Sequence, residues 1–266
     1  IRLSLVGSEM CIRDRPWGED GRLELALLEG MLRHESVQLV VLSSSISLPS
    51  AFALQPQDRL EVAQLLDRYD CWLLENDTCG ELGFKPAPVA LRDLVNPERL
   101  VVFASFEKIL GPEAPFGYAL SRHLSGELQR QFLLRSFRLS SIRQRAIARL
   151  YHSGKIDQHL HHLRLLLREQ AREMGELVGR HLGDQVTYRM PAGGATFWLG
   201  ASRAVDMRKA FHALLARQVV VAPGELFSLC GLHHQHLRLS STFHGQPNLD
   251  IALALVGEAL RDAQIS

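Results

Sequence analysis

Residues 99–120 read RLVVFASFEKILGPEAPFGYAL, and this stretch decides the fold. Its first six residues form a short apolar run that is typical of a buried strand, and residues 116–120 (FGYAL) predict another strand. Lys108 lies shortly after the carboxyl end of the first of these strands. Because open α/β sheets carry their ligands on the loops at that end, we expect chemistry in the segment 105–112.

Apolar runs alternate with helical patterns on the N-terminal side of this stretch. Residues 37–42 (VQLVVL) and 71–74 (CWLL) predict two further buried strands, and residues 56–69 predict an amphipathic helix between them. Buried strands that alternate with helices indicate an α/β fold with a mostly parallel sheet.

The pattern changes near residue 122, where the chain becomes mainly helical up to about residue 182. Apolar residues repeat at helical spacing over 156–177, which predicts one long helix. We therefore predict a large α/β domain over 16–165 and a small C-terminal α+β domain over 166–266, with the boundary inside that helix. In the small domain we expect strands at 186–190, 196–199, 219–222 and 236–240, and helices at 206–216 and 248–260.

Residues 1–15 (IRLSLVGSEMCIRDR) fit neither pattern and lack the order of a signal peptide. The stretch resembles a translated sequencing-adapter tail, so we set it aside as an artefact. On this interpretation we expect the natural chain to begin further upstream.

The composition of the 266 residues is that of a globular protein, with 46% apolar and 22% charged residues. A formal charge of +1 gives neither the basic footprint of a nucleic-acid binder nor an acidic excess. The apolar runs are too short to cross a membrane. The four cysteines lie far apart, which is typical of reduced thiols in a cytoplasmic protein.

Three places carry candidate chemistry. Among apolar neighbours, Lys108 is expected to be partly desolvated, which lowers the pKa of an amine and favours a Schiff base; an ordinary solvated lysine is the alternative. The polar residues 75–80, which follow a predicted strand, either hold a cofactor nitrogen or cap a turn. Arg238 stands among apolar neighbours on a predicted strand, where it either binds a planar carboxylate or forms a structural ion pair.

Two further patterns have simple interpretations. The glycines in residues 191–198 (PAGGATFW) allow either a close backbone approach to a bound group or a turn into a strand. His159 and His162 share a helix face, but no acidic residue completes a zinc ligand set, so we expect no metal site.

Taken in order, five motifs resemble those of the fold type I pyridoxal-phosphate enzymes, aminotransferase class I/II. The resemblance is closest to the C-terminal, aminotransferase-like domain of GntR-family, MocR-type transcriptional regulators, and it covers about residues 20–262. The motifs are SFEKILGP followed by FGY (105–118), IARLYHSGKIDQHLHHLRLLLREQ (147–170), PAGGATFWL (191–199), VVVAPGELFS (219–228) and HLRLS (236–240). The resemblance implies that residues 16–165 are the later part of the large cofactor domain, whose N-terminal part is missing.

The resemblance also implies a role for each matching residue. Lys108 would form the internal aldimine with pyridoxal 5'-phosphate (PLP), and Ser105 would contact its phosphate. Arg238 would bind the α-carboxylate of an amino-acid-like ligand, a task that suits its fork of donors.

Several positions depart from the family pattern. Asn76 stands where the family has the aspartate that keeps the pyridine nitrogen protonated, and an amide cannot supply that charge. Cys79 or Thr78 takes the place of the tyrosine near the ring oxygen. The other departures are Leu48 for an asparagine that contacts the ring oxygen, Pro115 for a phosphate-binding arginine and Glu107 for a serine. These replacements predict that PLP is held weakly.

The resemblance leaves three functions open. The first, which we favour, is the effector-binding half of a MocR-type regulator with a degenerate cofactor site, whose DNA contacts lie in an N-terminal domain outside these residues. The second is an active PLP-dependent aminotransferase acting on an amino acid and a 2-oxo acid. The third is a pseudo-enzyme that only dimerises. A cytoplasmic homodimer without a membrane segment is expected in each case.

Overall fold

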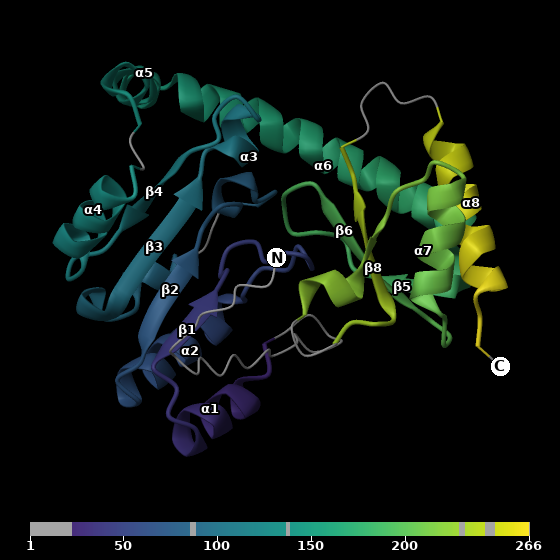
Figure 1. The fold of residues 1–266 in the computed structure, drawn as a ribbon, viewed down its shortest axis with the longest axis horizontal. Coiled ribbons are helices and arrows are strands. Elements are labelled where there is room, and N and C mark those ends of the chain that lie inside the picture. Colours follow the sequence, from purple (N-terminus) through teal and green to yellow (C-terminus); the bar gives the residue numbers. More distant parts are fainter. Residues whose placement is uncertain (1–22, 86–88, 137–138, 229–231, 243–247, 266) are drawn as a thin grey trace.

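The computed structural model describes residues 23–85, 89–136, 139–228, 232–242 and 248–265. They form two four-stranded sheets that are connected by one long helix, as Figure 1 shows. This arrangement confirms the expected α/β fold with a smaller α+β part.

The first sheet has the order β1-β2-β3-β4. Strands β1 (Leu39–Leu42), β2 (Trp72–Asn76) and β3 (Leu100–Ser105) are parallel, and β4 (Gly117–Leu120) is antiparallel to β3. The sheet is therefore mostly parallel, and the carboxyl ends of its first three strands meet at one edge.

The helices of this part are α1 (Leu25–His34), α2 (Pro56–Arg68), α3 (Glu107–Leu110), α4 (Ser125–Leu134) and α5 (Ser141–His152). Among them, α2 confirms the helix predicted at 56–69, and α4 and α5 lie in the region that was predicted to be mainly helical. Helix α2 begins with Pro56. The N–H groups of a first helical turn have no intrahelical acceptor, so the helix loses no hydrogen bond by having proline there. Its inner face buries Val62 and Leu66 against Leu73 of β2, and this contact is the centre of the first core.

The second sheet is antiparallel and has the order β5-β6-β8-β7. Leu237 of β8 and Phe197 of β6 are buried in the core that this sheet forms with the helices of the small domain. The elements are β5 (Val186–Tyr188), β6 (Thr196–Ala201), β7 (Ala222–Pro223), β8 (His236–Ser240), α7 (Met207–Ala216) and α8 (Leu249–Asp262).

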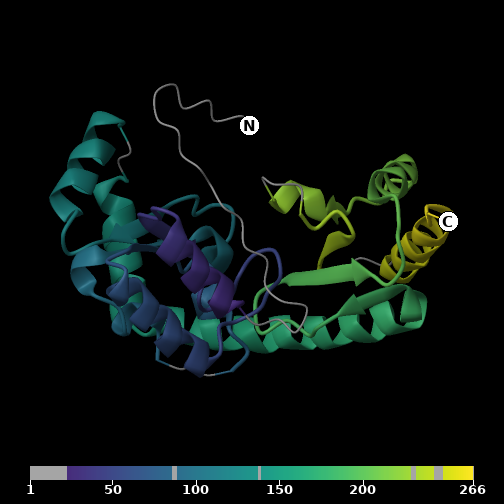
Figure 2. The same ribbon diagram turned by 90° about the horizontal axis from the view of Figure 1, so that it is seen from below.

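Helix α6 (Lys155–His181) is 27 residues long and connects the two sheets. Its first half packs Ile156 and Leu160 against Phe106 and Ile109, which follow β3. Its second half buries Met174 and Val178 in the core of the second sheet. Figures 1 and 2 both show the helix passing from one sheet to the helices of the other. The domain boundary at 165/166 stays a prediction.

Short 3-10 helices complete the described chain. They are η1 (Gly80–Leu82), η2 (Leu91–Asp93), η3 (Pro97–Arg99), η4 (Gly183–Gln185) and η5 (Gly224–Phe227). No helix among the residues that the structure describes is long and apolar enough to cross a membrane.

The glycine-rich stretch after residue 190 serves the packing of the backbone. Gly193 forms an isolated bridge with Gly83, and the N–H of Gly194 donates to the carbonyl of Leu82 at 3.0 Å. A Cβ at Gly193 would lie 2.5 Å from that carbonyl oxygen, so a side chain does not fit. The stretch turns at Gly194 into β6, as the second interpretation has it, and the backbone of Gly193 also approaches another segment of the same chain closely.

Candidate functional site

The candidate cofactor residues gather at the carboxyl edge of the first sheet. Asn76 ends β2 and pairs in register with Phe103 of β3, and the N–H of Asp77 donates to the carbonyl of Phe103 at 2.9 Å. Helix α3 starts directly after β3 and carries Lys108. The turn after β2 and the start of α3 are thus adjacent because their strands are hydrogen-bonded neighbours.

Lys108 extends into solvent more than the sequence suggests. Its side chain is 49% exposed, and the nearest carboxylate in the described chain is that of Glu107, whose Oε1 lies 3.9 Å from Nζ. With half of its side chain exposed, Lys108 is closer to the alternative of a solvated lysine than to a desolvated one. Lys108 also lies on a short helix, whereas a loop was expected.

Cys79 and Lys108 are close enough to influence each other. Cys79 is buried, and burial raises the pKa of its thiol, while the positive charge of Lys108 opposes this shift. Because burial is the larger effect, the thiol stays protonated and neutral near pH 7. Cys79 packs with Ile46 and Ala51 from the loop that follows β1.

Ser105 and Asn76 both use their side chains in local turns. The hydroxyl of Ser105 accepts a hydrogen bond from the N–H of Glu107 at 3.2 Å, at the start of α3. The Oδ1 of Asn76 accepts from the N–H of Thr78 at 3.1 Å. Each contact stabilises the backbone where the strand ends, as side chains of these types commonly do.

Asp77 is engaged by an arginine. Its side chain is buried and forms an ion pair with Arg92, with Nη1 and Oδ2 2.5 Å apart. The carboxylate of Asp77, which directly follows Asn76, is therefore neutralised by Arg92 of η2.

A buried polar network lies beneath this edge, and the sequence analysis missed most of it. Glu75 is fully buried, its Oε1 accepts from the hydroxyl of Ser44, and burial raises the pKa of the carboxyl group. Arg59 of α2 is also buried and donates to the carbonyls of Leu54, Val89 and Ser44 at 3.0–3.1 Å. The available signal was that an arginine stands on the helix face that carries Val62 and Leu66, which points to the core.

The loop after β1 closes the edge on a second side. The hydroxyls of Ser47 and Ser50 are 2.5 Å apart, and both residues are buried. Leu48, which precedes a cis proline, is 44% exposed. An apolar side chain therefore stands in this loop where the family resemblance implies an amide that contacts the cofactor.

Arg238 lies in the other domain, on β8. It is opposite Trp198 of β6 and Ala222 of β7, and its Cζ lies 5.0 Å from the centroid of the Phe227 ring. Among the described residues, Arg238 forms no ion pair, so the alternative of a structural ion pair is not observed there. Its guanidinium is therefore available to bind an anionic ligand.

His236 stacks on Trp198, with ring centroids 5.1 Å apart and planes 15° apart. The pKa of His236 is lowered to about 4, mainly by burial and then by the neighbouring His233 and His234. The ring is therefore neutral near pH 7.

The other histidines take ordinary positions in the described part of the chain. His159 contacts the carbonyl of Ile109 through Nε2 at 2.7 Å, which ties α6 to α3. Among the described residues, no three histidine, cysteine, aspartate or glutamate side chains are grouped so that they could hold a metal ion.

The chain belongs to the aminotransferase class I and II family, whose sequence model matches residues 12–255. This match begins inside the segment 1–15 that the sequence analysis sets aside.

The similar curated proteins are transcriptional regulators. The chain is 24% identical over 259 residues to the HTH-type transcriptional regulator YisV of Bacillus subtilis, covering 97% of this chain and 53% of that protein. It is 25% identical over 243 residues to the HTH-type regulator YdcR of Escherichia coli, covering 90% and 52%. The probable rhizopine catabolism regulatory protein MocR of Rhizobium meliloti is 26% identical over 190 residues, covering 71% and 38%. The chain spans about half the length, or less, of these relatives.

The similar solved structures are aminotransferases. LysN, the α-aminoadipate aminotransferase of Thermus thermophilus, superposes with a TM-score of 0.82 at 24% identity, covering 93% of this chain and 64% of that one. The multiple substrate aminotransferase of Thermococcus profundus gives a TM-score of 0.80 at 21% identity, covering 90% and 61%. These likenesses establish the fold.

Two side chains at this edge bear on how PLP could be held. The oxygen of Asn76 is already bonded to a backbone N–H, and an amide cannot keep a pyridine nitrogen protonated. The carboxylate of Glu107 lies 3.9 Å from the amine of Lys108, and a negative charge disfavours a phosphate dianion nearby.

Proposed function

We propose that this chain is the effector-binding, aminotransferase-like domain of a GntR-family, MocR-type transcriptional regulator with a degenerate cofactor site. The observation that carries the proposal is the edge chemistry around Lys108. The lysine is retained, but the same sheet edge carries the neutral amide of Asn76, the neutral thiol of Cys79 and the carboxylate of Glu107. The similarity to HTH-type regulators over most of the chain supports the same conclusion.

In this proposal the site keeps only some of the residues that hold PLP in the family. Lys108 and Ser105 remain on the cofactor side, with Asn76 and Cys79 in place of charged or phenolic contacts. A protonated thiol hydrogen-bonds weakly, and neither the thiol nor the amide adds charge, so PLP would bind with low affinity. Arg238 receives the carboxylate of an amino-acid-like effector.

DNA binding is assigned to another part of the regulator. The net charge of +1 gives this chain no overall basic character. We propose that DNA contacts come from an N-terminal domain outside these residues, and that the protein works in the cytoplasm.

A titration of the purified chain with PLP tests the degenerate site. We expect little of the absorbance of an internal aldimine, and Lys108→Ala is expected to change it little. Lys155→Ala, at the first position of α6, is the matched control for losing one amine. A strong absorbance that disappears in Lys108→Ala but persists in Lys155→Ala, together with turnover of an amino donor, contradicts the proposal.

An active aminotransferase is the second candidate. It is favoured by the retained Lys108 and by the fold likeness to LysN, which was solved with a phosphopyridoxyl-leucine adduct. Incubation with PLP, an amino acid and a 2-oxo acid, followed by detection of the new amino acid, separates the two functions. Product formation that depends on Lys108 supports the enzyme.

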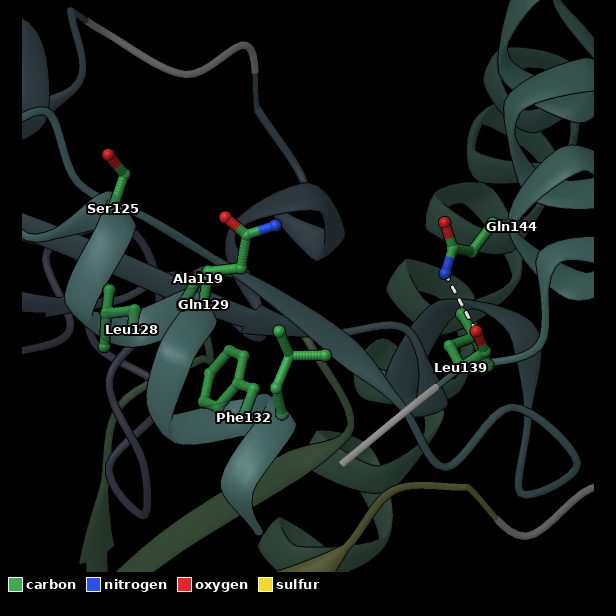
Figure 3. A pocket seen from close by; sticks show the side chains of 8 residues that line it. Ala119, Ser125, Leu128, Gln129, Phe132, Leu139 and Gln144 are labelled. Carbon is green, nitrogen blue, oxygen red and sulfur yellow. Dashed lines mark hydrogen bonds between the residues drawn. The ribbon is translucent and has the colours of Figure 1, made fainter. Parts of the chain in front are cut away.

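We also propose that the chain forms a homodimer, and the α4–α5 region supplies an apolar surface for it. No described residue of α4 or α5 is buried, and Leu134 and Ile142 are 68% and 80% exposed. A hollow of about 490 Å³ opens between β4, α4 and the start of α5. Figure 3 shows Phe132 on one side of it and Leu139 on the other, where the side chain of Gln144 donates to the carbonyl of Leu139 at 2.8 Å.

Large exposed apolar patches on proteins commonly mark interaction sites. Light scattering on the eluting peak of a size-exclusion column measures the oligomeric state. We expect a dimer for the wild type and a monomer for Phe132→Glu. Gln158→Glu, which adds a charge at an exposed position of α6 outside the hollow, is the control and should stay dimeric.

A further inference from the structure

Four side chains, those of Arg238, Phe227, Trp198 and His236, form a continuous series of contacts on the second sheet, which we call the stack. The guanidinium of Arg238 lies over the Phe227 ring at 5.0 Å, and Phe227 meets Trp198 edge-on, with centroids 5.8 Å apart at 83°. Trp198 is in turn stacked on His236. Carboxylate binding by Arg238 does not by itself explain why the other three residues are arranged in this way.

The stack lies on the face of the sheet that points away from the core of the small domain. Leu237 and Leu239 of β8 are buried in that core. Because successive residues of a strand face opposite sides, His236 and Arg238 point to the other face. Trp198 pairs directly with Arg238 across the strands and is only 9% exposed, so it forms a fixed base for the stack.

Phe227 is positioned by the short helix η5. Gly224 begins η5, and a Cβ there would lie 2.3 Å from the carbonyl oxygen of His233, so only glycine lets η5 approach β8 so closely. Glu225 of η5 forms an ion pair with Arg208 of α7 at 3.0 Å, which holds the segment from outside. Phe227 is thereby placed over the strand pair rather than in solvent.

The contact with Phe227 restricts the guanidinium without consuming its donors. A phenyl ring carries no carbonyl or carboxylate, and no described residue accepts a hydrogen bond from the guanidinium of Arg238, so its N–H donors remain for a carboxylate. The contact also reduces the number of side-chain conformations that a ligand would have to order, and this lowers the entropic cost of binding.

We propose that Phe227, held edge-on by Trp198, is a positioning residue that fixes the donor edge of Arg238 for a ligand carboxylate. The inference rests on the proposed function of Arg238 as the carboxylate-binding residue. The VVVAPGELFS segment would thus contribute to recognition of the ligand carboxylate, because it carries the aromatic ring that contacts Arg238.

The orientation of Arg238 is tested first, without any ligand. The Nε–Hε resonance of Arg238 is recorded by two-dimensional NMR of the full chain. We expect an upfield ring-current position in the wild type that is lost in Phe227→Leu and kept in Phe227→Tyr. Phe211→Leu, which removes a ring from α7 in the same domain, is the matched control and should leave the resonance in place.

Ligand binding is tested second, with L-leucine and L-leucinamide as probes in calorimetric titrations. We expect Phe227→Leu to weaken binding of L-leucine about two- to thirtyfold, the range of a cation–π contact from exposed to desolvated. L-leucinamide lacks the carboxylate, so its binding should not change. Phe227→Tyr should restore wild-type affinity; a general loss of structure would weaken both probes alike.

The two failures are distinguishable. An Arg238 resonance at the same position in the wild type and Phe227→Leu overturns the positioning role, whatever the ligand data. Equal affinity for L-leucine in the wild type and Arg238→Gln overturns the proposed function of Arg238, while the resonance still decides the stack. Phe227→Met is the second variant should Phe227→Leu not fold, and the same resonance shift is expected for it.

Discussion

Acidification should destabilise the small domain through one imidazole ring, that of His236. The ring is stacked on Trp198, and its Nδ1 is buried without a hydrogen-bond partner among the described residues. Burial opposes the imidazolium form, and the charges of His233 and His234 add to this effect, so the pKa falls to about 4 in the folded chain.

The sign and the magnitude follow from linkage. The unfolded chain takes up the proton near the ordinary pKa of about 6.5, whereas the folded chain resists it down to about 4. The stability from a neutral His236 is therefore complete above pH 6.5 and is lost progressively as the pH falls toward 4. A difference of this size corresponds to about 3 kcal/mol, which we reduce to about 2 kcal/mol because the ring is only partly buried.

The assay is urea unfolding between pH 7 and pH 4, followed by tryptophan fluorescence, for the wild type and His236→Phe. Phenylalanine keeps an aromatic ring on Trp198 but does not titrate. We expect the free energy of unfolding to fall by about 2 kcal/mol more in the wild type than in the variant over this range. Two curves that stay parallel from pH 7 to pH 4 would refute the reasoning.

Three further stability predictions can be checked by urea unfolding at pH 7. Gly193→Ala should destabilise the chain by about 1–3 kcal/mol, because its Cβ would meet a carbonyl oxygen at 2.5 Å; Gly179→Ala, with open space on α6, should instead stabilise it by about 0.5–1 kcal/mol. Equal effects of the two substitutions would contradict this account of the bridge. Arg59→Met should cost about 3 kcal/mol or more because two buried carbonyls, those of Leu54 and Ser44, and the part-buried carbonyl of Val89 lose their donor, whereas Arg68→Met, on the exposed side of the same helix, should change stability by under about 1 kcal/mol; a mild Arg59 variant would show that water replaces those donors. Asp206→Ala should cost about 1 kcal/mol by removing the side chain that caps α7, and a neutral result would mean that the cap is not formed in solution.

Most elements could be predicted from the sequence because their patterns are local. Strand β8 occupies the predicted residues 236–240, and α6 starts one residue before its apolar stripe and ends four residues after it. The lysine segment could be located because the carboxyl end of a parallel strand is a ligand position in any such sheet.

Strand ends were less predictable because they depend on partners. Residues 219–222 predicted a strand, but the ladder with β8 contains only Ala222 and Pro223. Gln218 has a φ of 62°, and the N–H of Val219 donates to the carbonyl of Leu214, so this segment still belongs to the turn after α7. Proline has no N–H to extend a ladder.

The environment of the candidate site depends on contacts between distant segments. Glu75 follows an apolar strand and was predicted to be in a polar loop, yet it lies inside β2 because Ser44, 31 residues away, supplies a donor. Lys108 is half-exposed for a similar reason, since the local apolar residues around it turn into the core against α6 while its own side chain does not. Neither fact is encoded in a local pattern.

Helix α6 has a consequence for how the chain unfolds. Both cores bury residues of the same helix, Ile156 and Leu160 on one side and Met174 and Val178 on the other. Melting either half breaks hydrogen bonds that run continuously into the other half, and a helix that loses its packing at one end is marginal by itself in water. The two sheets should therefore lose their structure in one cooperative transition, and a ligand bound to either should raise the melting temperature of both.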